Sequence, residues 1–239
     1  MKKEIRWIIS IIIVVLLVAG YYVIQHPPQF LRQGRSVKVL QFIRNPEEHQ
    51  DWILPAGTIC TDAPFQFPTD GFVGYLWGDS FRPGHNHSGL DIFSGTEPGV
   101  TPIYAVYDGY LTRESDWIST VIVRIPSDPL NPGRQIWTYY THMADKDGIS
   151  AIREEFPAGT HEVFVEAGTL LGYMGNYSGT PGNPTGVHLH LSIVKDDGNG
   201  NYLNETEIKN TLDPSAYLGM NLRGASNAGD VPMCLNTAP

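Results

Sequence analysis

Short apolar runs separated by turn residues dominate the chain from about residue 53 onward. Within them apolar and polar positions alternate over a few residues, which is typical of strands with one buried face. The runs end at turn sequences such as Tyr107-Asp108-Gly109 and Asp197-Gly198-Asn199-Gly200. This pattern predicts a mainly β domain of antiparallel sheets with little helix. The clearest runs are TPIYAVYDGYLTRE, STVIVRI, RQIWTYYTHM, HEVFVEAGTLLGYMG and VHLHLSIVKDDGNGNYLN.

Helix is expected in few places. We predict one helix near residues 149–155 and a short turn at Pro214 to Leu218, while Val37 to Ile43 is compatible with either a short strand or a short helix.

The N-terminus carries a second kind of pattern, an uncharged apolar run from Trp7 to Ile24 that follows three basic residues. Such a run is at the short end of what spans a bilayer as a helix. The alternative is a cleaved signal peptide, because Val18-Ala19-Gly20 offers small residues near a possible cleavage site. The apolar run continues past that point, so we predict one transmembrane helix within residues 1–25, acting as an uncleaved anchor.

Changes in composition divide the remaining chain. Residues 26–55 are polar and rich in proline, and are predicted to be a stalk or linker. Residues 56–219 are predicted to form the folded domain, and residues 220–239 a C-terminal tail. The two cysteines, Cys60 and Cys234, would tie this tail back in an oxidising compartment if they form a disulfide; two separate thiols fit the sequence equally well.

Length and charge narrow the function. A chain of 239 residues with 41% hydrophobic residues can bury one ordinary core, so one globular domain is expected. The formal net charge is -9, which leaves no basic footprint and argues against nucleic acid as a partner.

Four of the eight histidines are good candidates for chemistry. His26 and His49 lie in the polar stalk, His85 lies in a loop and His161 opens a strand, so these four are set aside. His87, His142, His188 and His190 remain, together with Asp91. Imidazoles and a carboxylate are ligands that zinc takes in proteins.

The spacing of these residues constrains the local backbone. Along a straight strand His87 and Asp91 would lie about 13 Å apart, too far to share one ion. The chain must therefore bend between them, and Gly89 allows a bulge or turn there. His188 and His190 would lie about 7 Å apart on one strand face, so both can border the same site.

The number of candidates favours an enzyme over a closed structural metal site. A catalytic zinc keeps three protein ligands and one open position for water, whereas five candidates are present. Two of them would be left for general acid, general base or oxyanion roles beside the metal. The spacing alone does not say which two.

Three ordered motifs, HSGLDI, YYTHM and GVHLHLSI, resemble those of the lysostaphin-like (LytM, M23) zinc metallopeptidases. GYLWGDSFRP, TPIYAVYDGYLT, VEAGTLLGYMGNYSG and LDPSAYL are similar to further segments of that family, so the resemblance covers about Gly71 to Leu218. It implies a two-sheet antiparallel domain that cleaves peptide cross-links in bacterial cell walls.

The resemblance also implies roles for the five residues. His87, Asp91 and His190 would hold Zn²⁺, and His142 and His188 would be the catalytic imidazoles. Tyr140, expected on the same strand face as His142, is a weaker candidate for supporting the oxyanion.

The function expected from the sequence is a membrane-anchored zinc endopeptidase that hydrolyses peptide bonds of peptidoglycan. Its partners would be the wall peptide and the membrane, with the domain on the extracytoplasmic side, or in the medium if the N-terminus is cleaved. The alternatives are a non-catalytic M23-type protein that regulates another wall hydrolase, and a peptidase for peptides outside the wall.

Overall fold

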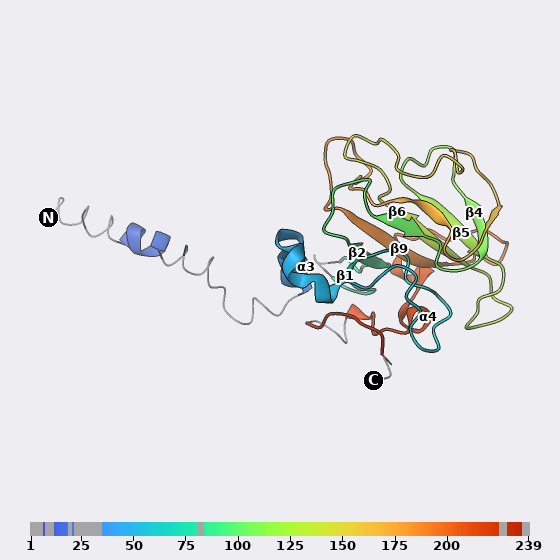
Figure 1. The fold of residues 1–239 in the computed structure, drawn as a ribbon, viewed down its shortest axis with the longest axis horizontal. Coiled ribbons are helices and arrows are strands. Elements are labelled where there is room, and N and C mark those ends of the chain that lie inside the picture. Colours follow the sequence, from blue (N-terminus) through green and yellow to red (C-terminus); the bar gives the residue numbers. More distant parts are fainter. Residues whose placement is uncertain are drawn as a thin grey trace.

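The computed structural model describes residues 7, 12–18, 21, 35–80, 84–224 and 229–235. Most of the regular structure consists of short antiparallel strands, as the alternating pattern predicts (Figure 1). The strands are β1 (Phe72–Tyr75), β2 (Leu90–Phe93), β3 (Pro102–Tyr104), β4 (Gly109–Thr112), β5 (Val121–Ile125), β6 (Ile136–Thr141), β7 (Val163–Val165), β8 (Leu170–Tyr173), β9 (His188–Lys195) and β10 (Thr211–Leu212). The helical elements are α3 (Arg35–Arg44), α4 (Ser215–Leu218) and the 3-10 helices η1 (Pro46–Trp52) and η2 (Ile208–Asn210).

The described strands form two sheets. The larger has the order β1-β2-β9-β6-β5-β4-β7, with β10 pairing to β9 as an additional strand, and the smaller pairs β3 with β8. All the pairings are antiparallel. The strand β9 lies in the middle of the larger sheet, between β2 and β6, so its residues are in contact with both neighbours.

The central strands direct alternate residues to opposite faces. On β9, Leu189, Leu191 and Ile193 belong to the main core, which also contains Ile103 of β3 and Leu171 of β8. The intervening residues of β9 point to the other face of the sheet, because successive strand residues alternate. The core therefore lies on one face of the larger sheet, and the histidines of β9 lie on the other.

The helix predicted at residues 149–155 is absent. Residues 149–153 are extended, with bridges from Ser150 to Ala144 and from Ile152 to Gly172, and residues 154–155 lie in a turn. The amide of Arg153 donates to the carbonyl of Leu171, and the amide of Tyr173 donates to the carbonyl of Ala151. Pairing with distant backbone thus overrides the helical propensity of this stretch.

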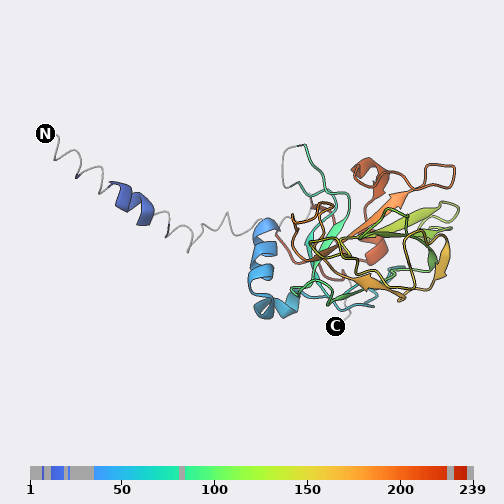
Figure 2. The same cartoon turned by 90° about the horizontal axis from the view of Figure 1, so that it is seen from above.

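Part of the segment placed in a linker by composition packs on the domain. Helix α3 lies beside β1 in both views (Figures 1 and 2), and Val39 and Phe42 are buried against Phe72 and Phe93. The aromatic rings of Phe42 and Phe72 are 5.1 Å apart. The predicted turn at 214–218 forms α4, and the segment at 37–43, which the sequence left open, is helical.

The docking of α3 gives a stability prediction. Phe42 is 0% exposed, so we expect Phe42→Ala to lower the free energy of unfolding by about 3 kcal/mol through lost burial and a cavity. Leu40 lies on the same helix but is 50% exposed, so Leu40→Ala should change it by less than about 0.5 kcal/mol. Urea unfolding of the full chain in detergent, followed by circular dichroism, compares the two. Equal stability of both variants would contradict this role of α3.

The predicted membrane anchor lies mostly outside the described residues. Of residues 1–25 the structure describes Trp7, residues 12–18 and Tyr21. Among all residues that are described, none belongs to a helix with the length and apolarity needed to cross a bilayer.

Cys60 and Cys234 form a disulfide, one of the two possibilities that the sequence left open. Their Cα atoms are 5.3 Å apart, although the residues are separated by 174 positions. The bond fixes the segment at 229–235 to the start of the domain. The tail is also held by Arg35, whose guanidinium donates to the carbonyl of Asp230 at 2.7 Å.

Candidate metal centre and active site

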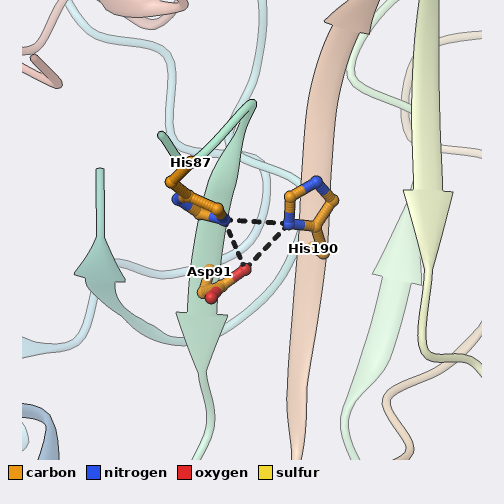
Figure 3. A group of neighbouring side chains, drawn as sticks. All are labelled: His87, Asp91 and His190. Carbon is orange, nitrogen blue, oxygen red and sulfur yellow. Dashed lines mark hydrogen bonds and ion pairs between the residues drawn. The ribbon is translucent and has the colours of Figure 1, made fainter. Parts of the chain in front are cut away.

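Three of the predicted site residues meet at one point on the face opposite the core. The Nε2 atom of His87 lies 3.1 Å from Oδ1 of Asp91 and 3.1 Å from Nδ1 of His190. The Nδ1 atom of His190 lies 2.9 Å from the same Asp91 oxygen. Figure 3 shows the three side chains pointing toward one another from β2, the turn before it, and β9. All three are buried, and together they could hold a metal ion.

Sheet register explains why Asp91 and His190 meet. Asp91 of β2 is the direct antiparallel partner of His190 of β9, and Thr141 of β6 pairs with His190 on the other side. Side chains of directly paired residues stand close together on the same face of a sheet. The pairing of β2 with β9 thus brings the two motifs together in space, although they are far apart in the sequence.

His87 reaches the same point because the chain bends before β2. Its amide donates to the carbonyl of Asp79 and its carbonyl accepts from Gly78, so it pairs with a different segment from Asp91. A Cβ atom on Gly89 would lie 2.3 Å from the carbonyl oxygen of Leu191. Only glycine fits this close approach of the two backbones. The chain also bends at Gly89, as predicted.

Hydrogen bonds determine which imidazole nitrogens carry protons. Nδ1 of His87 lies 3.0 Å from the carbonyl oxygen of Leu76, and a carbonyl can only accept, so Nδ1 donates and Nε2 keeps its lone pair. Nε2 of His190 lies 2.9 Å from the hydroxyl of Ser192 and 3.5 Å from a carboxylate oxygen of Glu205. The Nε2–H of His190 therefore points away from the cluster, and its Nδ1 lone pair points into it.

This arrangement fits a cation. Two nitrogen lone pairs and one carboxylate oxygen converge at 2.9 to 3.1 Å, and three acceptors that face one another need a positive charge between them. The donor set is the one that zinc prefers, and ligands of a tetrahedral zinc stand about 3.3 to 3.5 Å apart at the usual bond lengths. The group thus fits zinc with little adjustment of its side chains.

The charges in the pocket also favour a bound cation. Burial opposes charge on Asp91, but His87 and His188, together with hydrogen bonds from His190 and His87, hold its pKa well below the usual range. Burial also opposes charge on His190, yet Asp91 and Glu205 outweigh it and raise the pKa of His190 to about 10. The pocket therefore favours positive charge beside an ionised carboxylate. Without a metal this charge is the proton on Nδ1 of His190, and a bound cation would take the place of that proton.

The other two predicted residues, His142 and His188, stand next to this group. Their ring centroids are 4.4 Å apart, and Nε2 of His188 lies 3.6 Å from Oδ1 of Asp91. Nδ1 of His142 donates to the carbonyl of Tyr177 at 2.6 Å, and Nδ1 of His188 donates to the carbonyl of Gly186 at 2.7 Å. Each ring therefore keeps an Nε2 lone pair that can accept a proton.

Burial keeps these two imidazoles neutral. Burial, together with the neighbouring His188 and His190, lowers the pKa of His142 to about 3. Burial also lowers the pKa of His188, against the opposing effect of Asp91. The ring of Phe93 stacks on His188 with centroids 5.1 Å apart and limits its reorientation.

The backbone at His142 departs from strand geometry. Strand β6 ends at Thr141, and His142 has a φ of 72°, in the left-handed region that non-glycine residues seldom occupy. His142 thereby lines the same groove as Thr141. The expectation that Tyr140 shares its face is wrong: Tyr140 is 0% exposed in the main core, and its hydroxyl accepts from the amide of Val106 at 2.9 Å. Tyr139 lines the groove instead.

The five residues line one groove with a volume of about 560 Å³. Hydroxyl groups make up much of the remaining wall, and none of the described residues that line it is Lys or Arg. The wall residues besides the five are His85, Ser88, Ser119, Thr120, Tyr139, Thr141, Tyr177, Ser178, Gly179, Thr185, Glu205 and Thr206. The groove is open to solvent.

Two residues of the groove were not found from the sequence. His85 was set aside as a loop residue, but it lines the groove near the metal group. Glu205 was not considered, although its carboxylate lies 3.5 Å from Nε2 of His190. The proximity of His85 to His87 was the only available signal for His85, and no motif marks Glu205.

The chain is similar to solved M23 peptidase structures. Lysostaphin from Staphylococcus simulans matches with 18% identity and a TM-score of 0.40, over 71% of this chain and 56% of its own. The catalytic domain of the prophage-encoded M23 protein EnpA from Enterococcus faecalis matches with 22% identity and a TM-score of 0.36, over 63% of this chain and 96% of its own. These neighbours belong to the family that the sequence motifs resemble. No family model and no characterised protein sequence matches the chain.

Proposed function

We propose that the protein is a membrane-anchored zinc endopeptidase that hydrolyses peptide bonds of bacterial peptidoglycan. The observation that carries this proposal is the convergence of His87, Asp91 and His190 within 3.1 Å of one another, beside two neutral imidazoles in one open groove. A structural zinc site would be closed by a fourth protein ligand, whereas a catalytic one keeps an open position.

In the proposed assignment His87, Asp91 and His190 hold the metal. When bound, zinc supplies a Lewis acid that polarises a carbonyl and makes water a better nucleophile near neutral pH. The two hydrogen bonds on the outer nitrogens of His87 and His190 orient the rings so that both lone pairs face the metal position.

His142 and His188 handle protons and charge in this assignment. Each has Nδ1 fixed on a backbone carbonyl, so Nε2 accepts the proton that the attacking water loses. The imidazolium formed in this way returns the proton to the leaving amine. The other imidazole, whose ring centroid lies 4.4 Å away, would stabilise the negative charge that develops on the carbonyl oxygen when its Nε2 carries a proton to donate.

The groove supports a peptide substrate. Its wall is rich in hydroxyl groups, and its described lining has carboxylates at Asp91 and Glu205 but no Lys or Arg. A polyanion would be repelled, whereas a neutral or amine-bearing peptide can hydrogen-bond along the wall.

The proposed location is the outer side of the cell membrane. Residues 1–25 would anchor the chain, residues 26–34 would connect the anchor to α3, and the domain would begin near Arg35 rather than at residue 56. The disulfide between Cys60 and Cys234 supports an oxidising, extracytoplasmic compartment.

The experiment that tests the function uses the full chain purified in detergent and incubated with purified peptidoglycan. We expect new free amines to appear, to be abolished by a chelator and to return when zinc is added back. Mass spectrometry of the products would identify the cleaved bond. Zinc-loaded protein that releases no amines from peptidoglycan would contradict the proposal, and cleavage of unrelated peptides only would indicate a different substrate.

A further inference from the structure

The carboxylate of Glu205 lies behind the proposed metal ligand His190, on the side away from the metal position. Its Oε2 atom is 3.5 Å from Nε2 of His190, 3.4 Å from the hydroxyl of Ser192 and 3.3 Å from the hydroxyl of Ser88. The side chain of Glu205 is only 18% exposed. Among the described residues no Lys or Arg pairs with it, so its surroundings differ from those of an ordinary surface carboxylate.

The direction of the hydrogen bonds follows from the metal position. If Nδ1 of His190 binds a cation, the ring proton must sit on Nε2, and Nε2 then donates to Ser192 at 2.9 Å. The Ser192 hydroxyl has its own proton left to donate, and the carboxylate of Glu205 can only accept. The hydrogen bonds therefore all point one way: His190 donates to Ser192, and Ser192 donates to Glu205.

The fold holds Glu205 in this place. After β9 the chain turns at residues 196–201 and comes back, with the amide of Leu203 donating to the carbonyl of Lys195. Tyr202 packs edge-on against Trp137 with centroids 5.4 Å apart. The amide of Thr206 donates to the side chain of Asn204 at 3.1 Å, which fixes the turn that contains Glu205.

We infer that Glu205 is a positioning residue that orients His190 and strengthens its binding of the metal, acting both directly and through Ser192. A carboxylate close to the outer N–H makes the inner nitrogen a better electron-pair donor to the metal and fixes the ring orientation. The inference rests on the proposed metal site, and it adds a carboxylate that lies outside the motif GVHLHLSI.

The test measures zinc affinity of the full chain by competition with a chelator of known affinity. Glu205→Gln keeps the size of the side chain but removes its charge, and it should raise the zinc dissociation constant by about 10- to 100-fold. Ser192→Ala removes the intermediate hydroxyl and should weaken zinc binding in the same direction. Glu207→Gln is the matched control, because Glu207 lies two residues away and pairs with Lys209 at 2.7 Å instead; its zinc affinity should equal that of the wild type.

Two readouts separate positioning from a general structural role. The circular dichroism spectrum of the zinc-free protein should be the same in Glu205→Gln and in the wild type, and the visible absorption of the cobalt-substituted protein should change in Glu205→Gln but not in the control Glu207→Gln. A wild-type zinc affinity in Glu205→Gln would overturn the inference while leaving the proposed function intact. Failure of the wild-type protein itself to bind zinc would overturn both.

Discussion

Replacing His188 or His142 with alanine is expected to lower kcat by about 10²- to 10⁴-fold while the protein keeps its zinc. Both imidazoles have Nδ1 committed to a backbone carbonyl, and neither belongs to the group that converges on the metal position. Each variant therefore loses a proton acceptor or a charge stabiliser and retains all three metal ligands. The measurement is kcat on a soluble wall peptide that the enzyme cleaves, with zinc per chain determined on the same protein sample.

A matched control for these variants is His161→Ala, because His161 is an exposed histidine that does not line the groove. It should keep both zinc and turnover. If His188→Ala lost its zinc completely, or turned over at the wild-type rate, the separation between ligand and catalytic imidazole would be wrong.

Replacing His190 with alanine is expected to abolish zinc binding and, with it, activity. In the proposed site His190 is one of three protein ligands, and its Nδ1 atom lies 2.9 to 3.1 Å from the ligand atoms of the other two. The loss of zinc affinity should exceed the roughly 100-fold that removal of a partner behind a ligand can cost. The variant also removes one of the groups that hold the pKa of Asp91 low, so the pocket loses positive charge beside a buried carboxylate.

Zinc per chain after gel filtration, measured by elemental analysis, tests this expectation. The comparison is between His190→Ala and His188→Ala, which differ by two positions on the same strand face. The first should carry no zinc and the second one zinc per chain. A full zinc content in His190→Ala would mean that the metal binds elsewhere.

The sheet and the strand that carries two histidines could be predicted from the sequence because they depend on local pattern. Alternation along β9 places Leu189 and Leu191 in the core and His188 and His190 on the opposite face. The need for a bend at Gly89 follows from distance alone. These features require knowledge of only a few neighbouring residues.

Features that depend on distant partners could not be predicted in the same way. Residues 149–155 have helical propensity, but their backbone groups bond to Met143 and Leu171 in an extended arrangement. Tyr140 and His142 are two positions apart, which suggests a shared face, but the strand ends at Thr141 and the left-handed backbone of His142 breaks the alternation. The local pattern of apolar and polar residues predicts neither the extended pairing of the first segment nor the end of the strand before His142.

The surroundings of the metal group show the same limit. Glu205 comes near His190 only because the chain reverses after β9, and no motif marks that return. The disulfide depends equally on spatial closeness, since Cys60 and Cys234 are 174 positions apart in the chain. The site residues could be predicted from the sequence because they cluster in motifs. The residues that surround them, such as Glu205, are brought near only by the fold.

The location of bound zinc tests the central claim most directly. Crystals of the zinc-loaded protein, measured on either side of the zinc absorption edge, would give an anomalous difference map that places the metal without reference to any mechanism. The structure predicts a single strong peak between Nε2 of His87, Oδ1 of Asp91 and Nδ1 of His190, with about 2.0 to 2.2 Å to each atom. A peak elsewhere in the molecule, or none between these three side chains, would contradict the account.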